Sequence, residues 1–170
     1  MPPYYARRMP AAQPLPWVGK KPYTPLWRTL QTHPPISNAR STGVILLTGI
    51  DPFGADTVNP SWLVAQALDG QRIAGHRVVA AQLSTVFGKS LRQLEALVAT
   101  HRPALVVCLG QAGGRNALSL ERVGININDA RIPDNAGHQP IDTPVVPGGP
   151  AAYFSSLPVK VMLQGVLRAG

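Results

Sequence analysis

The chain has 170 residues, 45% of them apolar, and a single cysteine. This length predicts one folded domain with a sizeable core, with or without a tail, and one cysteine excludes an intramolecular disulfide framework. The longest apolar run is too short to span a bilayer and the N-terminus lacks the apolar core of a secretory signal, so we expect a soluble, cytoplasmic protein with no membrane contact.

The net charge of +8 is concentrated in the first 42 residues, which hold six basic and no acidic side chains, whereas residues 43–170 hold ten basic and eight acidic ones. Residues 1–42 also contain nine of the 18 prolines, which forbid helix interiors. We therefore predict a disordered basic tail over 1–42 and a folded domain over 43–170. A solvated tail is favoured over specific nucleic-acid binding. A polyproline ligand, a transit peptide and an over-long translation start are the alternatives for this tail.

From residue 43 onward, short apolar runs alternate with amphipathic segments. Buried strands are predicted at 43–49, 77–83, 104–110 and 123–127. The Asn59-Pro60 pair predicts a helix start, with Asn as cap and Pro at the first helical position. A leucine-rich stripe predicts a second helix at 89–103, and Pro158 opens a third that Gly170 would cap.

This alternation predicts an α/β fold: a three-layer α/β/α domain with a mostly parallel mixed sheet. In such sheets ligands bind beyond the carboxyl ends of the strands. Those ends read "TGIDPFG", "STVFGKS" and "GQAGGR", all rich in small or turn-forming residues. Their convergence predicts a site at that edge of the sheet.

Several common site motifs are incomplete. "STVFGKS" ends like a phosphate-binding loop, but Leu83 stands where its first glycine is required, and "GQAGG" does not match a dinucleotide fingerprint. The four histidines lack metal-ligand spacing, and Asp129, Asp134 and Asp142 fit turn chemistry better than a cation site. Cys108 lies in the apolar run "VVCLG", where we predict a buried, inert thiol. We thus predict no metal and no cofactor.

Glu121 follows the glycine-rich loop "GQAGGR" and precedes a predicted strand. A carboxylate near a strand end is a candidate site residue. The alternative is a surface carboxylate paired with Arg115 or Arg122, and the spacing alone does not reject it.

The segments "LLTGIDPFG", "VNPSW", "STVFGKS", "CLGQAGGR", "LERVGININDARIPDN" and "GGPAAYFSSLPVK" together resemble pyroglutamyl peptidase I, also called pyrrolidone-carboxylate peptidase. The resemblance covers roughly residues 44–170 in colinear order. It implies a cytoplasmic thiol peptidase that removes pyroglutamate (5-oxoproline) from the N-terminus of peptides, and a homo-oligomer, often a tetramer.

The resemblance also assigns roles to individual residues. Glu121 matches the glutamate of a Cys–His–Glu arrangement, which would steady the imidazolium. Arg131 matches an arginine that anchors the pyroglutamyl carbonyl. The remaining matches line the lactam pocket: Phe53 as a ring-stacking phenylalanine, Asn59 and Gln111 as polar residues, and Ile132 as an apolar wall. Ile50 replaces the first stacking phenylalanine, and Ser84 stands where the family prefers proline.

The family's nucleophile and base belong to a "GTFVCNH"-like segment that follows the helix ending this sequence at Gly170, and no such segment occurs here. Cys108 aligns with a non-catalytic strand position. We therefore expect a truncated, catalytically inactive domain whose sheet is incomplete at its C-terminal side, with apolar surface exposed. The alternative hypotheses are a non-catalytic pyroglutamate-binding remnant, or pseudoenzyme, and a protein that acts through its basic tail.

Overall fold

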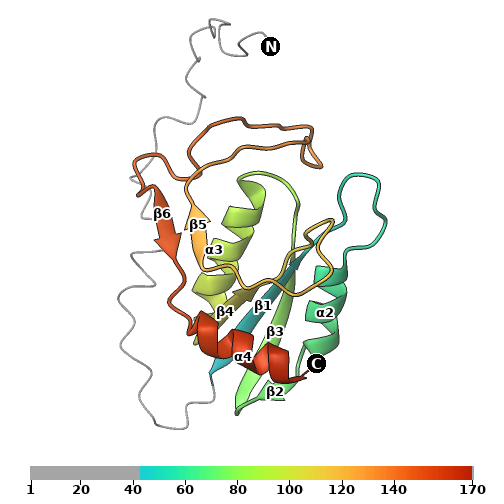
Figure 1. Cartoon of the computed structure of the whole chain (residues 1–170), viewed down its shortest axis with the longest axis vertical. Helices are drawn as coiled ribbons and strands as arrows, with labels where there is room; N and C mark the ends of the chain where they lie inside the picture. Colours follow the sequence, from blue (N-terminus) through green and yellow to red (C-terminus); the bar gives the residue numbers. More distant parts are fainter. Residues whose placement is uncertain (1–42, 170) are drawn as a thin grey trace, which may run out of the picture. The chain divides into compact units, whose positions relative to one another are not determined.

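The computed structural model of the chain describes residues 43–169 (Figure 1). The predicted tail over 1–42 and the predicted capping residue Gly170 lie outside the described residues. None of the helices in the described part is long and apolar enough to cross a bilayer.

A four-stranded sheet forms the centre of the domain, in the order β2-β3-β1-β4 (Figure 1). Its strands are β1 (Val44–Ile50), β2 (Arg72–Ile73), β3 (His76–Leu83) and β4 (Leu105–Cys108). β1 pairs in parallel with both β3 and β4, and only the short β2 is antiparallel. The predicted mostly parallel mixed sheet is therefore confirmed.

Helix α2 (Pro60–Leu68) packs on one face of this sheet. Leu47 of β1, Val78 of β3 and Ala65 of α2 form the buried cluster between them. Trp62 packs against this cluster from the first turn of α2. Successive strand residues point to opposite faces, so the residues next to Leu47 point away from α2.

Helix α3 (Lys89–His101) also contacts β1 and β3. The chain crosses from β1 to β3 through α2 and returns from β3 to β4 through α3, in the reverse direction. Since crossovers between parallel strands are right-handed, this reversal puts the two helices on opposite sides. Leu46 points to the α3 side and is fully buried. The three-layer α/β/α arrangement predicted from the sequence is confirmed.

Two predicted buried strands are less buried than expected. β5 (Val123–Ile125) pairs only with β6 (Ala152–Phe154), in a separate antiparallel ribbon, and all three of its residues are exposed. β4 is shorter than the predicted run at 104–110 and none of its residues is fully buried. The reason is the same for β4 and β5: in the described part of the chain, each of these two strands pairs with a neighbour on one side only. The third predicted helix forms as α4 (Val159–Ala169), directly after Pro158.

Candidate active site

The three parallel strands end at one edge of the sheet. Ile50 lies opposite Leu83, and Thr48 lies opposite Cys108, so the loops that follow β1, β3 and β4 all start from this edge. These loops carry the sequences that we expected to converge, and their convergence is confirmed. Ile50 and Phe53, at the end of β1 and in its following loop, are both half-buried.

Asn59 ties the loop after β1 to the first turn of α2. Its side-chain Oδ1 accepts hydrogen bonds from the backbone N–H of Ser61 at 3.0 Å and from the Ser61 hydroxyl at 2.7 Å. Its Nδ2 donates to the Asp51 carbonyl at 3.3 Å. The predicted helix cap is therefore confirmed. Asn59 is buried, and its bond to the Asp51 carbonyl fixes the start of the loop that carries Phe53.

Gln111, in the loop after β4, has an unsatisfied amide oxygen. Its Nε2 donates to Oδ2 of Asp56 at 3.1 Å, which links this loop to the loop after β1. Its Oε1 is buried and has no hydrogen-bond partner in the described structure. A buried acceptor without a donor costs about 1–3 kcal/mol, so this oxygen is suited to receive a donor from a ligand.

Arg131 and Ile132 are exposed and lie in a long hairpin-like excursion between β5 and β6. The two arms of this excursion are joined by backbone bonds between Asn128 and Thr143 at 2.7 and 3.1 Å. The excursion returns at a turn in which the His138 carbonyl accepts from the Asp134 N–H at 2.8 Å.

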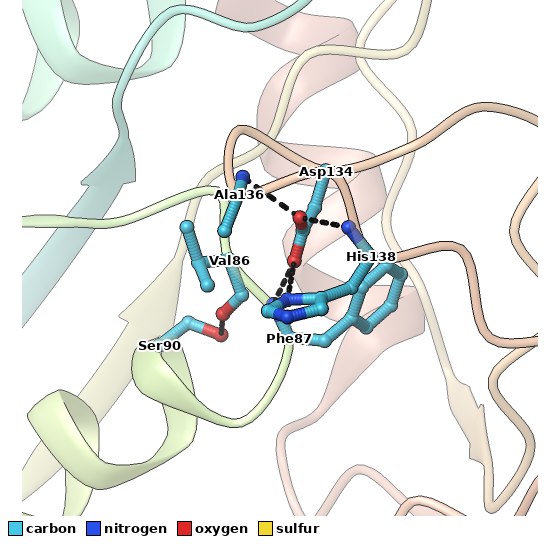
Figure 2. A network of polar contacts seen from close by, with 6 residues as sticks. All are labelled: Val86, Phe87, Ser90, Asp134, Ala136 and His138. Atoms are coloured by element: carbon cyan, nitrogen blue, oxygen red, sulfur yellow. Dashed lines mark hydrogen bonds and ion pairs between the residues drawn. The ribbon is translucent and has the colours of Figure 1, made fainter.

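Asp134 anchors this turn to the loop after β3 (Figure 2). One carboxylate oxygen accepts from the Phe87 N–H at 2.8 Å, and the other accepts from the N–H groups of Ala136 and His138 at 2.8 Å each. The His138 imidazole lies 3.4 Å from the carboxylate, whose side chain is 2% exposed.

Two opposing effects act on the pKa of Asp134. Burial raises the pKa of this carboxyl, but the three backbone donors and the nearby imidazole outweigh burial and hold the pKa below its ordinary value of 3.8. Asp134 therefore serves as an ionised turn anchor, in line with the turn chemistry that the sequence indicates.

Glu121 is paired with a guanidinium. Its Oε1 lies 3.0 Å from Nη1 of Arg115, and the Glu121 side chain is 74% exposed. This is the surface ion pair that the sequence left open as the alternative. Such exposed pairs contribute about 0–1 kcal/mol to stability, so the pair leaves Glu121 free to exchange partners at little cost.

The prediction that Cys108 is buried is wrong, because this free cysteine is exposed; that its thiol is inert stays a prediction. Cys108 ends the edge strand β4, whose open side has no neighbour in the described part. An apolar run cannot distinguish a central strand from an edge strand.

No group of three or more His, Cys, Asp or Glu side chains is arranged to hold a metal ion in the part of the chain that the structure describes. Asp51 and Asn135 are not among the predicted site residues, but their side chains connect the loops at the sheet edge. The available signal was the pair of turn sequences "IDPF" and "PDNAG", which place side-chain acceptors and donors beside strand ends.

The family profile described as pyroglutamyl peptidase matches residues 44–170. A pyrrolidone-carboxylate peptidase 1 of Ralstonia nicotianae is 56% identical over 126 residues, which are 74% of this chain and 59% of the relative. A pyrrolidone-carboxylate peptidase of Klebsiella pneumoniae is 55% identical over the same length. The chain thus spans about three-fifths of the length of these relatives.

Solved structures give the same result. The pyroglutamyl peptidase I of Bacillus amyloliquefaciens superposes with a TM-score of 0.73 at 46% identity, over 75% of this chain and 62% of that one. The pyrrolidone carboxyl peptidase of Pyrococcus furiosus gives a TM-score of 0.73 at 42% identity, over 75% and 61%. Profile, sequence identity and fold each match about three quarters of the chain, and the chain belongs to the pyroglutamyl peptidase family.

Proposed function

We propose that the folded part of this chain forms the substrate-binding portion of a pyroglutamyl peptidase, and that it holds the five-membered lactam of a peptide's N-terminal pyroglutamate. Two things support this: the family match over residues 44–170, and the loops that meet at one sheet edge. The same proposal includes a cytoplasmic location and self-assembly into homo-oligomers.

The observation that carries the proposal is the unsatisfied Oε1 of Gln111. A lactam ring is flat and apolar on both faces, and its edge offers one N–H donor and one carbonyl acceptor. The lactam N–H would satisfy the Gln111 oxygen, and the exposed guanidinium of Arg131 would donate to the carbonyl. Phe53 and Ile50, both half-buried, would supply the apolar contact to the ring faces, with Ile132 as a further wall.

Hydrolysis needs a nucleophile and a base in addition to these binding groups. Glu121 would orient the base in this family, but here its partner is Arg115 rather than an imidazole. Cys108 is exposed on an edge strand. We therefore propose that the 170-residue chain binds pyroglutamate without turning over a pyroglutamyl peptide.

The test uses the 170-residue chain with two assays. Calorimetry with 5-oxoproline should give saturable binding at millimolar ligand, and a chromogenic pyroglutamyl amide should release no chromophore. Gln111→Ala should weaken binding by roughly 3- to 10-fold, because one hydrogen bond is worth about 0.5–1.5 kcal/mol. Gln66→Ala, an exposed glutamine on α2, is the matched control and should change nothing.

Absence of heat at millimolar 5-oxoproline would overturn the binding proposal. Chromophore release that Cys108→Ala abolishes would overturn the proposal that this chain does not hydrolyse its ligand.

A further inference from the structure

We infer that Asn135 is a positioning residue that couples the two walls of the proposed lactam site: the loop that carries Phe53 and the excursion that carries Arg131. The expected effect of Asn135 on ligand affinity rests on the proposed function. The contacts that support it concern this chain's own loops.

On one side, Asn135 holds the loop after β1. Its Nδ2 donates to the Pro52 carbonyl at 2.8 Å, one residue before Phe53. The same nitrogen lies 3.5 Å from Oδ1 of Asp51, a weaker contact. These bonds join residues more than 80 positions apart in the sequence. Among the described residues, they are the side-chain hydrogen bonds that directly link the two walls.

The backbone of Asn135 is bound to the loop after β3, which completes a closed set of contacts. The Asn135 N–H donates to the Thr85 carbonyl at 3.0 Å. Thr85 in turn donates from its N–H to Oδ1 of Asp51 and from its hydroxyl to the Asp51 carbonyl at 3.1 Å. Asn135, Thr85 and the Asp51-Pro52 pair therefore fix one another's positions.

On the other side, Asn135 helps to fix the position of Arg131. The excursion is fixed before Arg131 by the bond from the Ala130 N–H to the Pro140 carbonyl at 2.9 Å. It is fixed after Arg131 by Asp134 and Asn135, which bind the loop after β3. The three residues 131–133 span these two points, so a shift at Asn135 shifts the guanidinium relative to Phe53.

The two walls must lie at the right distance from each other before one small, rigid ring can contact both of them. If the side-chain link is lost, the ligand has to order the two loops on binding, and this ordering reduces its affinity. We expect the dissociation constant for 5-oxoproline to rise about tenfold, the effect of roughly 1.4 kcal/mol.

The experiment compares Asn135→Asp and Asn135→Ala with the 170-residue parent chain. Asn135→Asp keeps the side chain's shape and the backbone bond to Thr85 but replaces the amide donor by a carboxylate beside Asp51, whereas Asn135→Ala removes the donor without adding charge. Gln139→Ala is the matched control, because the Gln139 amide donates to the Ala130 carbonyl at 3.1 Å within the excursion and does not reach the loop after β1. Amide hydrogen exchange and 5-oxoproline binding are measured on each protein.

Both Asn135 variants should speed exchange in residues 51–56 and 130–134 together, with exchange in β1 unchanged, and should weaken 5-oxoproline binding about tenfold. Gln139→Ala should speed exchange in the excursion alone. Unchanged exchange in residues 51–56 of both Asn135 variants would overturn the coupling. If the parent chain fails to bind 5-oxoproline, the proposed function is overturned, and the exchange data alone decide the coupling.

Discussion

At the scale of single residues, Asp134 makes stability depend on pH in a definite direction. Its pKa in the folded chain is below the ordinary value of 3.8, because hydrogen bonds to the carboxylate outweigh its burial. A lowered pKa means that the folded state binds a proton less readily than the unfolded state, so Asp134 stabilises the fold above about pH 4. This contribution should disappear as pH falls from about 4 through the lower folded pKa.

Chemical denaturation of the parent and of Asp134→Asn between pH 7 and pH 2.5 measures this effect. The difference in unfolding free energy between the two proteins should be present wherever the Asp134 carboxylate is ionised, and it should shrink as the pH falls below about 4. Gln139→Ala removes an uncharged contact of the same excursion, and its effect should be the same at every pH. A difference for Asp134→Asn that is equally constant would contradict the expected titration.

At the scale of elements, the packing of α2 on β1 depends on the absence of a side chain at Gly49. A Cβ at this position would lie 2.5 Å from Cα and 2.6 Å from N of Trp62, both backbone atoms of the first turn of α2. Because the neighbouring backbone is held by the Asn59 cap, it cannot move away cheaply. Gly49→Ala should therefore lower the free energy of unfolding by roughly 2–3 kcal/mol.

The same substitution elsewhere in the chain is the control. Gly165, inside α4, has open space around the position of a Cβ. Gly165→Ala should stabilise the chain by roughly 0.5–1 kcal/mol, because alanine is the better helix former. Urea denaturation of both variants tests the pair, and a Gly49→Ala protein as stable as the parent would mean that α2 does not approach β1 this closely.

The sequence predicted those elements whose signal is local. The Asn59-Pro60 pair marks the start of α2, and the apolar run before it marks β1, because capping and burial both act within a few residues. It did not reveal that β5 pairs with β6, since this pairing joins Val123 to Phe154 across a long excursion. For the same reason the contact from Asn135 to Pro52 could not be read from either turn alone.

At the scale of the whole molecule, the described part carries apolar side chains that nothing in it covers. On the β5-β6 ribbon, Ile125 is 64% and Phe154 69% exposed, and on α4, Val161 is 66% and Leu167 73% exposed. Apolar surface of this kind favours association, because burying it between two molecules stabilises the complex by about 25 cal/mol per Å². We therefore expect the 170-residue chain to self-associate at tens of micromolar, despite a net charge of +8 that opposes it.

Sedimentation velocity of two lysine variants separates the apolar contribution from that of charge. Leu167→Lys removes apolar surface and adds one positive charge, whereas Gln164→Lys, at an exposed polar position of the same helix, adds the same charge alone. If apolar burial drives association, Leu167→Lys should shift the distribution towards the monomer and Gln164→Lys should leave it nearly unchanged. Equal shifts would mean that charge repulsion controls association, and a parent chain that sediments as a monomer would show that this surface does not associate.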